Sequence, residues 1–410
     1  MIVQQDDVGE SPQSQTPRIG RDAGTPGAVV IGGDYLGLGI VRSLGRHGIP
    51  VCVIDDERNI ARWSRYTTHR VRVVNLRDPE RAIDALMETG RRLELDGWVL
   101  YPTRDETVAA LSSHRDQLST IFRVPVPEWD VVRWAWDKEN TYELAASVGV
   151  PTPRTWYPEK ESDLDQIDAD PPYALKPGVK ERFFYATGAK AWRADDRAQL
   201  LDLFRQATAV AGPGEIMVQE LIPGGGDQQV AYNAYCREGR PVASLTVQRR
   251  RQHPPQFGRA STYVETVELP ELEAQSARLL AEIGYEGLVE LEYKRDPRDG
   301  VCKLLDFNAR AWGYHSIAQK AGVDFPYLLY ADQIGRTVEP GHARAGVRWV
   351  RLVTDTPTAL LQLARRELRL RDYLASLRRV NTEAVFSRDD PLPFMAEIAL
   401  LPYLMVVRGF

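Results

Sequence analysis

A regular alternation of strand-like and helix-like runs begins at residue 28, and it limits the fold more than any other feature of the chain. The apolar run AVVIGG at residues 28–33 predicts a short buried strand. Further strands are expected at residues 51–55 and 97–101, and helices at 36–48 and 79–91. Strands that alternate with helices form a parallel sheet covered on both faces. Residues 28–135 are therefore predicted to form an α/β domain with a Rossmann-like parallel sheet.

From residue 137 onward, strands and helices no longer alternate one for one. Helices are expected at residues 138–148, 198–208 and 271–283, and strands at 173–176, 216–221, 229–237, 240–249, 288–295 and 301–308. Mixed runs of this kind are typical of an α+β domain. We predict that this domain covers residues 136–338.

The two ends of the chain differ in composition from the rest. Residues 1–27 are rich in Gln, Asp, Ser, Pro and Gly and lack periodicity, which predicts a disordered tail. Residues 339–410 are predicted to form a C-terminal helical extension, with a helix at 358–377. Glu397 and Pro402 interrupt the apolar end that follows, so we expect this end to dock onto the protein body or a membrane surface rather than span a bilayer.

Composition excludes several classes of protein. The formal net charge is -5, which argues against a general nucleic-acid binder. The three cysteines, Cys52, Cys236 and Cys302, are too few and too scattered for a disulfide framework or a zinc site, and we expect them to be buried. No long uncharged apolar run and no signal pattern occurs, so we expect a cytoplasmic protein without integral membrane association.

The segment EGLVELEYKRDPRDGVCKLLDFNARAWG, residues 286–313, carries a regular alternation of polar and apolar side chains. Glu290, Glu292 and Lys294 share one strand face, and Leu304, Asp306, Asn308 and Arg310 share a face of the returning strand. A hairpin centred on Asp299 places Glu292 opposite Asp306 and Glu290 opposite Asn308. Like charges directly opposite each other are destabilising, so two facing carboxylates favour a bound cation.

Two interpretations of this hairpin remain open from the residues alone. Oxygen ligands without His or Cys suit a hard ion, and Mg²⁺ usually binds through one or two carboxylates together with substrate phosphates. The alternative is a solvent-facing charged strand in which Lys294 neutralises one acid. A register slip of one residue would reverse every face.

Several segments of the chain resemble stations of the ATP-grasp superfamily, and they occur in that family's order. The hairpin with its acid-x-Asn-x-Arg run resembles the metal-binding end of the family, and YALKP resembles its strand with a phosphate-binding lysine. The runs KENTYELAASVGVPTPRTW and VQELIPGGGDQQV resemble its opening helix and its adenine hinge. The runs GGDYLGLGIVRSLGRHGIPV, RRRQHPPQFGRAS and FNARAWGYHSIAQKAGVDFP resemble the carboxylate–amine ligase group of the superfamily.

The resemblance implies a two-lobed ATP-grasp domain with a lid at about residues 150–220, preceded by the Rossmann-like domain. It implies ATP-binding roles for residues of the opening helix, the strand and the hinge, namely Lys138, Lys176, Gln219, Glu220, Leu221, Ile222 and Asp227. It implies a metal site at Glu292, Asp306 and Asn308, and it makes Arg310 the catalytic residue that stabilises the transferred phosphoryl group. Arg249–Arg251 and Arg259 are candidates for the substrate or the phosphates, and His315 is expected to structure its loop.

The chain departs from the family pattern at two places. Asp306 stands where the family often has Glu, which shortens the reach to a metal. The run PGVKERFFYATGAK after Lys176 lacks the glycine–serine cluster that is usual in the family. Lys190 is a candidate to contact the phosphates in its place. Substrate groups are expected between the N-terminal sheet and the hairpin, at Asp34, Arg104 and Asp105.

The function implied by the resemblance is ATP-dependent joining of a small-molecule carboxylate and an amine through an acyl phosphate, with ATP and Mg²⁺ (or Mn²⁺) as cofactors. Nucleic-acid partners are not expected, and a homodimer is compatible with the sequence. Three alternatives stay open: an ATP-dependent phosphotransferase of the same fold, a catalytically silent scaffold, and a dinucleotide-binding oxidoreductase. The last rests on the glycines of GGDYLGLG and on Asp55 at the end of the next strand.

Overall fold

The computed structural model describes residues 25–254, 258 and 260–408. The predicted disordered tail therefore lies outside the described residues as far as residue 24. Its last residues are ordered, contrary to the prediction: the Pro26 carbonyl accepts a hydrogen bond from the Tyr330 hydroxyl, and the Gly27 carbonyl accepts one from the Val99 amide at 3.0 Å. These contacts fix the start of the first strand against the body of the protein.

The predicted parallel sheet is present in the first part of the chain, with strand order β3-β2-β1-β4 and parallel pairing throughout. Its strands are β1 (Ala28–Ile31), β2 (Val51–Asp55), β3 (Thr67–Arg72) and β4 (Val99–Pro102), and the helices around them are α1 (Tyr35–Arg46), α2 (Pro79–Leu93), α3 (Asp105–Ser113), α4 (Arg115–Ser119) and α5 (Trp129–Trp136). The sequence analysis missed β3, because this edge strand carries the polar run TTHRVR.

A large, mostly antiparallel sheet of eight strands follows, in the order β13-β12-β9-β10-β11-β15-β16, with β14 paired to β10. Its strands are β9 (Gln229–Arg237), β10 (Arg240–His253), β11 (Ala260–Thr266), β12 (Gly287–Arg295), β13 (Cys302–Asn308), β14 (Gly341–His342), β15 (Arg348–Val350) and β16 (Thr382–Glu383). The accompanying helices are α6 (Lys138–Ser147), α9 (Pro270–Glu282), α10 (Ser316–Ala321) and α11 (Phe325–Gln333). The last three strands come from the predicted helical extension, which is therefore part of this sheet.

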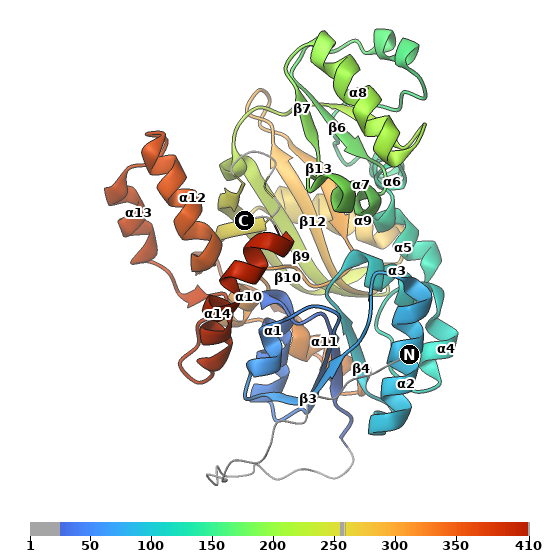
Figure 1. Cartoon of the computed structure of the whole chain (residues 1–410), viewed down its shortest axis with the longest axis vertical. Helices are drawn as coiled ribbons and strands as arrows, with labels where there is room; N and C mark the ends of the chain where they lie inside the picture. Colours follow the sequence, from blue (N-terminus) through green and yellow to red (C-terminus); the bar gives the residue numbers. More distant parts are fainter. Residues whose placement is uncertain (1–24, 255–257, 259, 409–410) are drawn as a thin grey trace.

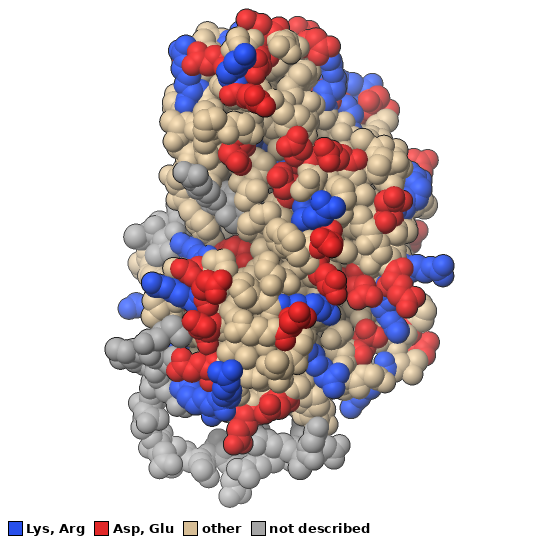
Figure 2. All heavy atoms as spheres, turned by 90° about the vertical axis from the view of Figure 1, so that its right-hand side faces the viewer, with Lys and Arg blue, Asp and Glu red and all other residues tan. Residues whose placement is uncertain are grey.

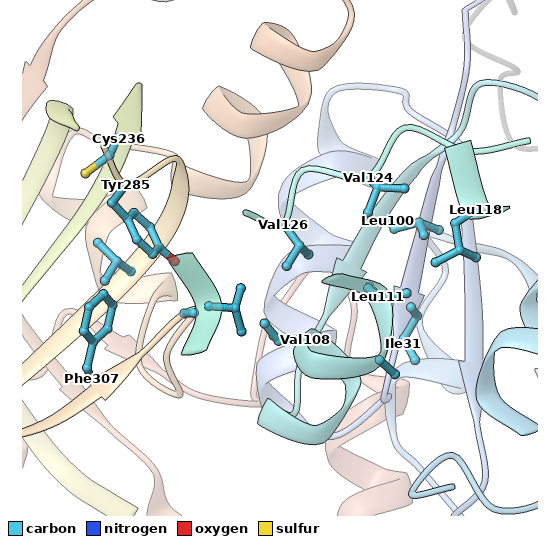
Figure 3. Close-up of a cluster of buried hydrophobic side chains, with 14 of the residues drawn as sticks. Ile31, Leu100, Val108, Leu111, Leu118, Val124, Val126, Cys236, Tyr285 and Phe307 are labelled. Carbon is cyan, nitrogen blue, oxygen red and sulfur yellow. The ribbon is translucent and has the colours of Figure 1, made fainter. Parts of the chain in front are cut away.

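A small sheet of order β5-β8-β6-β7 lies above the large one in Figure 1. It consists of β5 (Thr155–Trp156), β6 (Tyr173–Pro177), β7 (Trp192–Ala194) and β8 (Ile216–Glu220), with helices α7 (Lys180–Thr187) and α8 (Arg197–Ala211). This unit, which we call the lid, has its own hydrophobic core that includes Tyr173, Phe183 and Phe204. The N-terminal sheet and the large sheet instead share a core, in which Leu100 and Val108 belong to the same cluster as Tyr285 and Phe307 (Figure 3).

The C-terminal part differs from the prediction of one helix at 358–377. Two helices are present, α12 (Leu352–Ala364) and α13 (Leu370–Leu377), and they project from the left-hand side of the molecule in Figure 1. The apolar end forms α14 (Leu392–Arg408), which docks onto the body through a buried ion pair of 3.1 Å between Glu397 and Arg351. Among residues 25–254, 258 and 260–408, no helix is long and apolar enough to cross a membrane.

A turn just before α14 is fastened to the N-terminal sheet. The Asp390 carboxylate is buried and accepts hydrogen bonds from Arg42 Nε at 2.9 Å, Ser64 Oγ at 2.7 Å and the Arg65 amide at 2.9 Å. The neighbouring Asp389 pairs with Arg46 of α1 at 3.0 Å. The N-terminal sheet domain and the turn before α14 therefore meet in one polar cluster.

Cys52 and Cys236 are buried as predicted, whereas Cys302 is half-buried. Acidic and basic side chains are interspersed over the face shown in Figure 2. The domain boundaries at residues 27/28, 135/136 and 338/339 stay a prediction.

Candidate active site

The hairpin of β12 and β13 has the predicted register where the acids lie. Glu290 is paired with Asn308, and Glu292 with Asp306. The pattern slips by one residue immediately beyond Glu292, so that Tyr293 pairs with Leu304 and Leu305 has no direct partner. The Leu304 amide donates to the carbonyl of Pro151 at 2.7 Å, which draws this residue out of the regular ladder and accounts for the bulge.

The bulge corrects one part of the sequence analysis. Leu304 was expected to share a face with Asp306, but it lies in the hydrophobic core with Leu291 and Phe307. Leu305 instead lines a cavity together with Asp306. Lys294 does not neutralise an acid of the hairpin, because its ammonium donates to the carbonyls of Ile222 and Gly224 at 2.8 Å each.

Two basic side chains approach the facing carboxylates. Lys138 Nζ lies 2.5 Å from Asp306 Oδ1, and Arg249 Nη2 lies 3.1 Å from Glu292 Oε2. Asn308 Nδ2 donates to Glu292 at 3.3 Å and to Glu290 at 3.1 Å. The predicted metal residues therefore lie together, and each carboxylate already has a positive partner.

Glu290 is a fourth member of this cluster that the sequence analysis did not assign to the site. It is 5% exposed, and its carboxylate accepts a hydrogen bond of 2.6 Å from the Tyr314 hydroxyl. Burial, together with the nearby charge of Glu292, raises the pKa of Glu290 to about 7. Its position two residues before Glu292, on the same strand face, was the sequence feature that could have placed it in the site.

A cavity of about 470 Å³ adjoins the carboxylates and lies between the lid and the large sheet. The predicted ATP-binding residues that line it are Lys138, Lys176, Gln219, Glu220, Leu221 and Ile222. The metal candidates Glu292 and Asp306, and also Lys190 and Arg249, line the same cavity. Asp227, the predicted ribose contact, does not line it and lies exposed on a short 3-10 helix at Gly226–Gln228.

Lys176 is held in place by a chain of hydrogen bonds. Its ammonium donates to Gln219 Oε1 at 2.7 Å, and Gln219 Nε2 donates to the Tyr142 hydroxyl at 3.1 Å and to Thr155 Oγ1 at 2.9 Å. Burial, and secondly the positive charge of Lys138, lower the pKa of Lys176 to about 7. Because Lys138 is already paired with Asp306, Lys176 is the lysine whose charged form an anionic ligand would stabilise.

In the hinge at the end of β8, the side chain of Glu220 accepts more hydrogen bonds than the sequence predicted. The Glu220 carboxylate accepts from Lys303 and from Arg298, each at 3.0 Å, and from the Arg154 amide at 3.1 Å. Although burial opposes it, these donors lower the pKa of Glu220. An adenine amino group would therefore be one more donor on a carboxylate that is already ionised and oriented.

Arg310 faces the N-terminal sheet and forms an ion pair with Asp105 at the start of α3. Nη2 donates to Oδ2 at 3.0 Å, and Nε lies 2.7 Å from Oδ1 without forming a hydrogen bond. Burial disfavours the charged guanidinium, but the carboxylate of Asp105 more than compensates and raises the pKa of Arg310. The fork of Arg310 is thus already arranged around a carboxylate.

The other two substrate candidates have structural partners. Arg104 pairs with Asp55 at 3.0 Å and with Asp56 at 2.9 Å, and Asp34 caps α1 by accepting from the amides of Leu36 and Gly37. Of the three side chains expected to meet the substrate, Asp105 alone contacts a predicted catalytic residue in the structure described here.

The basic run of β10 divides into three different roles. Arg249 lines the cavity, whereas Arg250 pairs with Glu265 at 2.9 Å on the surface. Arg251 pairs with Asp355 of α12, with two contacts of 2.8 Å, and so it anchors the C-terminal helices rather than a phosphate. Arg259 lies outside the described residues.

Helix α7 occupies the position where the family carries a glycine-rich loop. It ends at Gly188, which adopts φ 69° in the left-handed region. The Tyr185 hydroxyl of α7 donates to Glu106 of α3 at 2.6 Å, and the Arg77 guanidinium lies 4.2 Å from the Tyr185 ring. The lid therefore contacts the N-terminal domain directly. A glycine after the run KERFFYAT was a helix C-terminal signal that the sequence analysis did not use.

Asp55, the acid that the dinucleotide alternative assigned to a ribose, has a structural role instead. Asp55 is 1% exposed, accepts from the Gly33 amide at 2.7 Å and pairs with Arg104, so it fixes the turn after β1.

His315 is buried with Nε2 3.0 Å from the Leu36 carbonyl, which confirms its structural role. A side chain at Gly39 would lie 2.6 Å from that imidazole, so this glycine allows α1 to approach the His315 loop.

The carboxylate oxygens of the hairpin also suit a metal ion as ligands. Within the described ranges, no group of three or more His, Cys, Asp and Glu side chains is arranged to hold an ion. The two carboxylates are therefore too few for a protein-only site. They fit a Mg²⁺ ion that shares its remaining positions with phosphate oxygens.

Comparisons with known proteins agree with this geometry. A family model described as "ATP-grasp in the biosynthetic pathway with Ter operon" matches residues 215–355, which include the hinge, β9–β13 and Arg310. This part of the chain is similar to the ATP-grasp family. The resemblance noted in the sequence is thereby confirmed.

A curated relative and two solved structures support the assignment. D-aspartate ligase of Enterococcus faecium is 24% identical over 300 residues, which cover 69% of this chain and 70% of the relative. L-amino acid ligase from Bacillus licheniformis has a TM-score of 0.60 at 16% identity and covers 79% of this chain and 78% of its own. The biotin carboxylase domain of the Hydrogenobacter thermophilus 2-oxoglutarate carboxylase, whose crystals hold MgADP, ADP and bicarbonate, has a TM-score of 0.62 at 16% identity, with coverage of 78% and 73%. The structural matches establish the ATP-grasp fold, and these relatives support an enzyme of the ligase type.

Proposed function

We propose that the protein is an ATP-dependent carboxylate–amine ligase that forms an acyl phosphate and releases ADP and phosphate. The observation that carries the proposal is one cavity shared by Lys176, the hinge and the facing acids Glu292 and Asp306. Arg310 is linked to the same cluster through Asn308, at 3.3 Å. The D-aspartate ligase and L-amino acid ligase relatives favour an amino acid as the acid or the amine.

In this proposal the cavity binds ATP with its phosphates toward the hairpin. Lys138 and Lys176 supply positive charge to the phosphates, and the uncompensated charge of Lys176 makes an anionic ligand favourable. The backbone from Glu220 to Ile222 receives the adenine. Because Asp227 lies off the cavity, its contact with the ribose is the least supported of the predicted roles.

Glu292, Asp306 and Asn308 would hold Mg²⁺, with Glu290 beside them. When bound, the ion neutralises phosphate oxygens during phosphoryl transfer. Lys138 and Arg249 already bond these carboxylates, and both side chains would shift toward the phosphates as the acids take up the ion. Basic partners thus orient the two acids before any ligand arrives.

Arg310 would stabilise the charge that develops on the acid as it becomes an acyl phosphate. A carboxylate has a poor leaving group, and phosphorylation supplies a good one that must then be protected from water. The ion pair with Asp105 holds the guanidinium at the boundary between the two sheets. The lid, with α7 against Glu106, covers the same region and would exclude water.

The reaction is tested by the fate of the carboxylate oxygen. Purified protein is incubated with ATP, Mg²⁺ and paired acids and amines, and ADP release is followed. With an ¹⁸O-labelled acid, one label should appear in the released phosphate. AMP and pyrophosphate as products would show that the acyl-phosphate proposal is wrong, and a phosphorylated product without an amide would indicate a phosphotransferase.

We also propose the division into a sheet domain at residues 28–135, an ATP-grasp domain at 136–338 and an extension at 339–410. The parallel sheet lies within the first range, and both remaining sheets begin in the second. Proteolysis of the native protein should cut first near these boundaries.

A further inference from the structure

The surface formed by residues 360–379, at the outer ends of α12 and α13, exposes leucines to solvent. Leu360 is 59% exposed and Leu361 is 49% exposed on α12, and Leu370 is 58% exposed and Leu374 is 45% exposed on α13. Leu370 and Leu374 are one helical turn apart and share a face. Four exposed leucines so close in the chain are unusual for a surface without a partner.

The same surface is strongly basic. Residues 360–379 contain six arginines, at positions 365, 366, 369, 371, 378 and 379, against two acids, Glu367 and Asp372. The net charge of this segment is therefore +4, in a chain whose formal net charge is -5. All six arginines are exposed. Exposed leucines and arginines thus occur together in one segment, whose two helices project from the body (Figure 1).

The exposure is a property of a folded element, because the inner faces of both helices are firmly attached. Asp355 of α12 is 0% exposed and binds Arg251 through both oxygens at 2.8 Å. The Arg251 guanidinium lies 5.1 Å from the ring of Tyr373 on α13, and it also donates to Ser376 Oγ at 3.0 Å. A hydroxyl contact of 3.3 Å between Thr356 and Tyr373 joins the two helices to each other. The leucines are therefore presented by a rigid support.

We infer that residues 360–379 dock the protein onto an anionic lipid membrane, a role outside the proposed ligase reaction. Leucines that enter the headgroup region and arginines that bind lipid phosphates supply the two signals that stable attachment requires. The surface projects from the body and no helix of residues 25–254, 258 and 260–408 can span a bilayer, so the protein would lie on the membrane.

The charge distinguishes this occupant from a second copy of the chain. Two copies that met through this surface would bring two segments of charge +4 together, which is unfavourable. A lipid bilayer, in contrast, accepts a projecting apolar tip without a complementary groove, and its anionic headgroups match the arginines. An acidic protein partner is the remaining alternative, and the experiment separates it from lipid.

The experiment is co-sedimentation of the full chain with vesicles of phosphatidylcholine alone and of phosphatidylcholine with 30% phosphatidylglycerol (about 7:3). We expect binding to the anionic vesicles only, weakened when NaCl is raised from about 0.1 to 0.5 M. Arg365→Gln with Arg366→Gln should lower the partition coefficient roughly 10- to 30-fold, since each arginine near such a surface contributes about fivefold. Leu370→Asp with Leu374→Asp should lower it by at least about 10-fold.

The matched control is Leu392→Asp, which removes a leucine of similar exposure (53%) on α14, outside the docking surface. This variant should bind vesicles like the unmodified protein, and unchanged circular dichroism should show that all variants fold. The inference is overturned by absent binding, by equal binding to neutral vesicles, or by an equal loss in the control. Retention on immobilised polyglutamate without vesicle binding would indicate an acidic protein partner. A dimer that Leu370→Asp with Leu374→Asp dissociates, without vesicle binding, would indicate a second copy.

Discussion

Replacement of Lys176 by Met tests whether the charge of this lysine destabilises the ligand-free protein at the proposed ATP cavity. The substitution keeps the length of the side chain and removes the ammonium. A pKa of about 7, compared with 10.5 for a free lysine, corresponds to at most about 4–5 kcal/mol of unfavourable charging at 1.36 kcal/mol per pKa unit. The side chain is half-buried and water screens part of this effect, so we expect about 2–3 kcal/mol. The lost hydrogen bond to Gln219 offsets about 1 kcal/mol of the gain.

The sign of the pH dependence is the sharper part of this prediction. Between pH 7 and 10.5 the unfolded chain keeps the proton on Lys176, whereas the folded protein has lost it. The stability of the unmodified protein should therefore rise with pH in this window relative to Lys176→Met. Near pH 10.5 the advantage of the variant should be gone, and only the cost of the lost hydrogen bond should remain.

Urea unfolding of the ligand-free protein at several pH values from 7 to 10 measures this difference. Lys160→Met, at an exposed lysine of the lid, is the control and should show no such trend. A difference between Lys176→Met and the unmodified protein that stays constant over the whole pH range would refute the reasoning. The same variant should also bind ATP much more weakly, because it lacks the charge that the phosphates neutralise.

Three further predictions concern the acids, the arginine and the lid. Glu292→Gln and Asp306→Asn should each reduce Mg²⁺-dependent ADP release by about 100-fold or more without unfolding the protein. The control Asp227→Asn, outside the cavity, should retain activity, and wild-type-like Mg²⁺ titrations of both acid variants would contradict the metal site. Arg310→Lys keeps the charge but loses the fork, so kcat should fall by about 100-fold while nucleotide affinity changes little; an equal loss of both in kinetic and binding assays would show that Arg310 acts on ATP itself. Tyr185→Phe removes the hydrogen bond between the lid and Glu106 and should speed release of a fluorescent nucleotide about fivefold in stopped-flow measurements, and an unchanged rate would show that this contact does not hold the lid.

The hairpin shows how far the sequence could predict the site. Glu292 and Asp306 were placed opposite each other correctly because the tight DPRDG turn and the period of two leave few registers. The slip at Leu305 could not be predicted in the same way. It depends on a hydrogen bond from Leu304 to Pro151, about 150 residues earlier in the chain. Local periodicity contains no information about such a contact.

The roles of individual arginines were also beyond the sequence. Arg249 and Arg251 are two residues apart, yet one lines the cavity and the other binds Asp355 of α12. The irregular pairing of β10 with β11 between Arg249 and Gln252 separates their directions, and the buried acid that selects Arg251 lies 104 residues away. A charge run in a sequence therefore predicts basic character at a site, but the fold decides which member contacts the ligand.

The attachment of Asp390 to Arg42 has a consequence for synthesis of the chain. These residues are 348 positions apart, so the buried guanidinium of Arg42 receives its carboxylate only after Asp390 has been made and has left the ribosome. The N-terminal sheet is made long before Asp390 and would wait, with a buried cation uncompensated, until that residue is available. Chaperones that shield α1 during this interval would then affect the yield of folded protein more than its final stability.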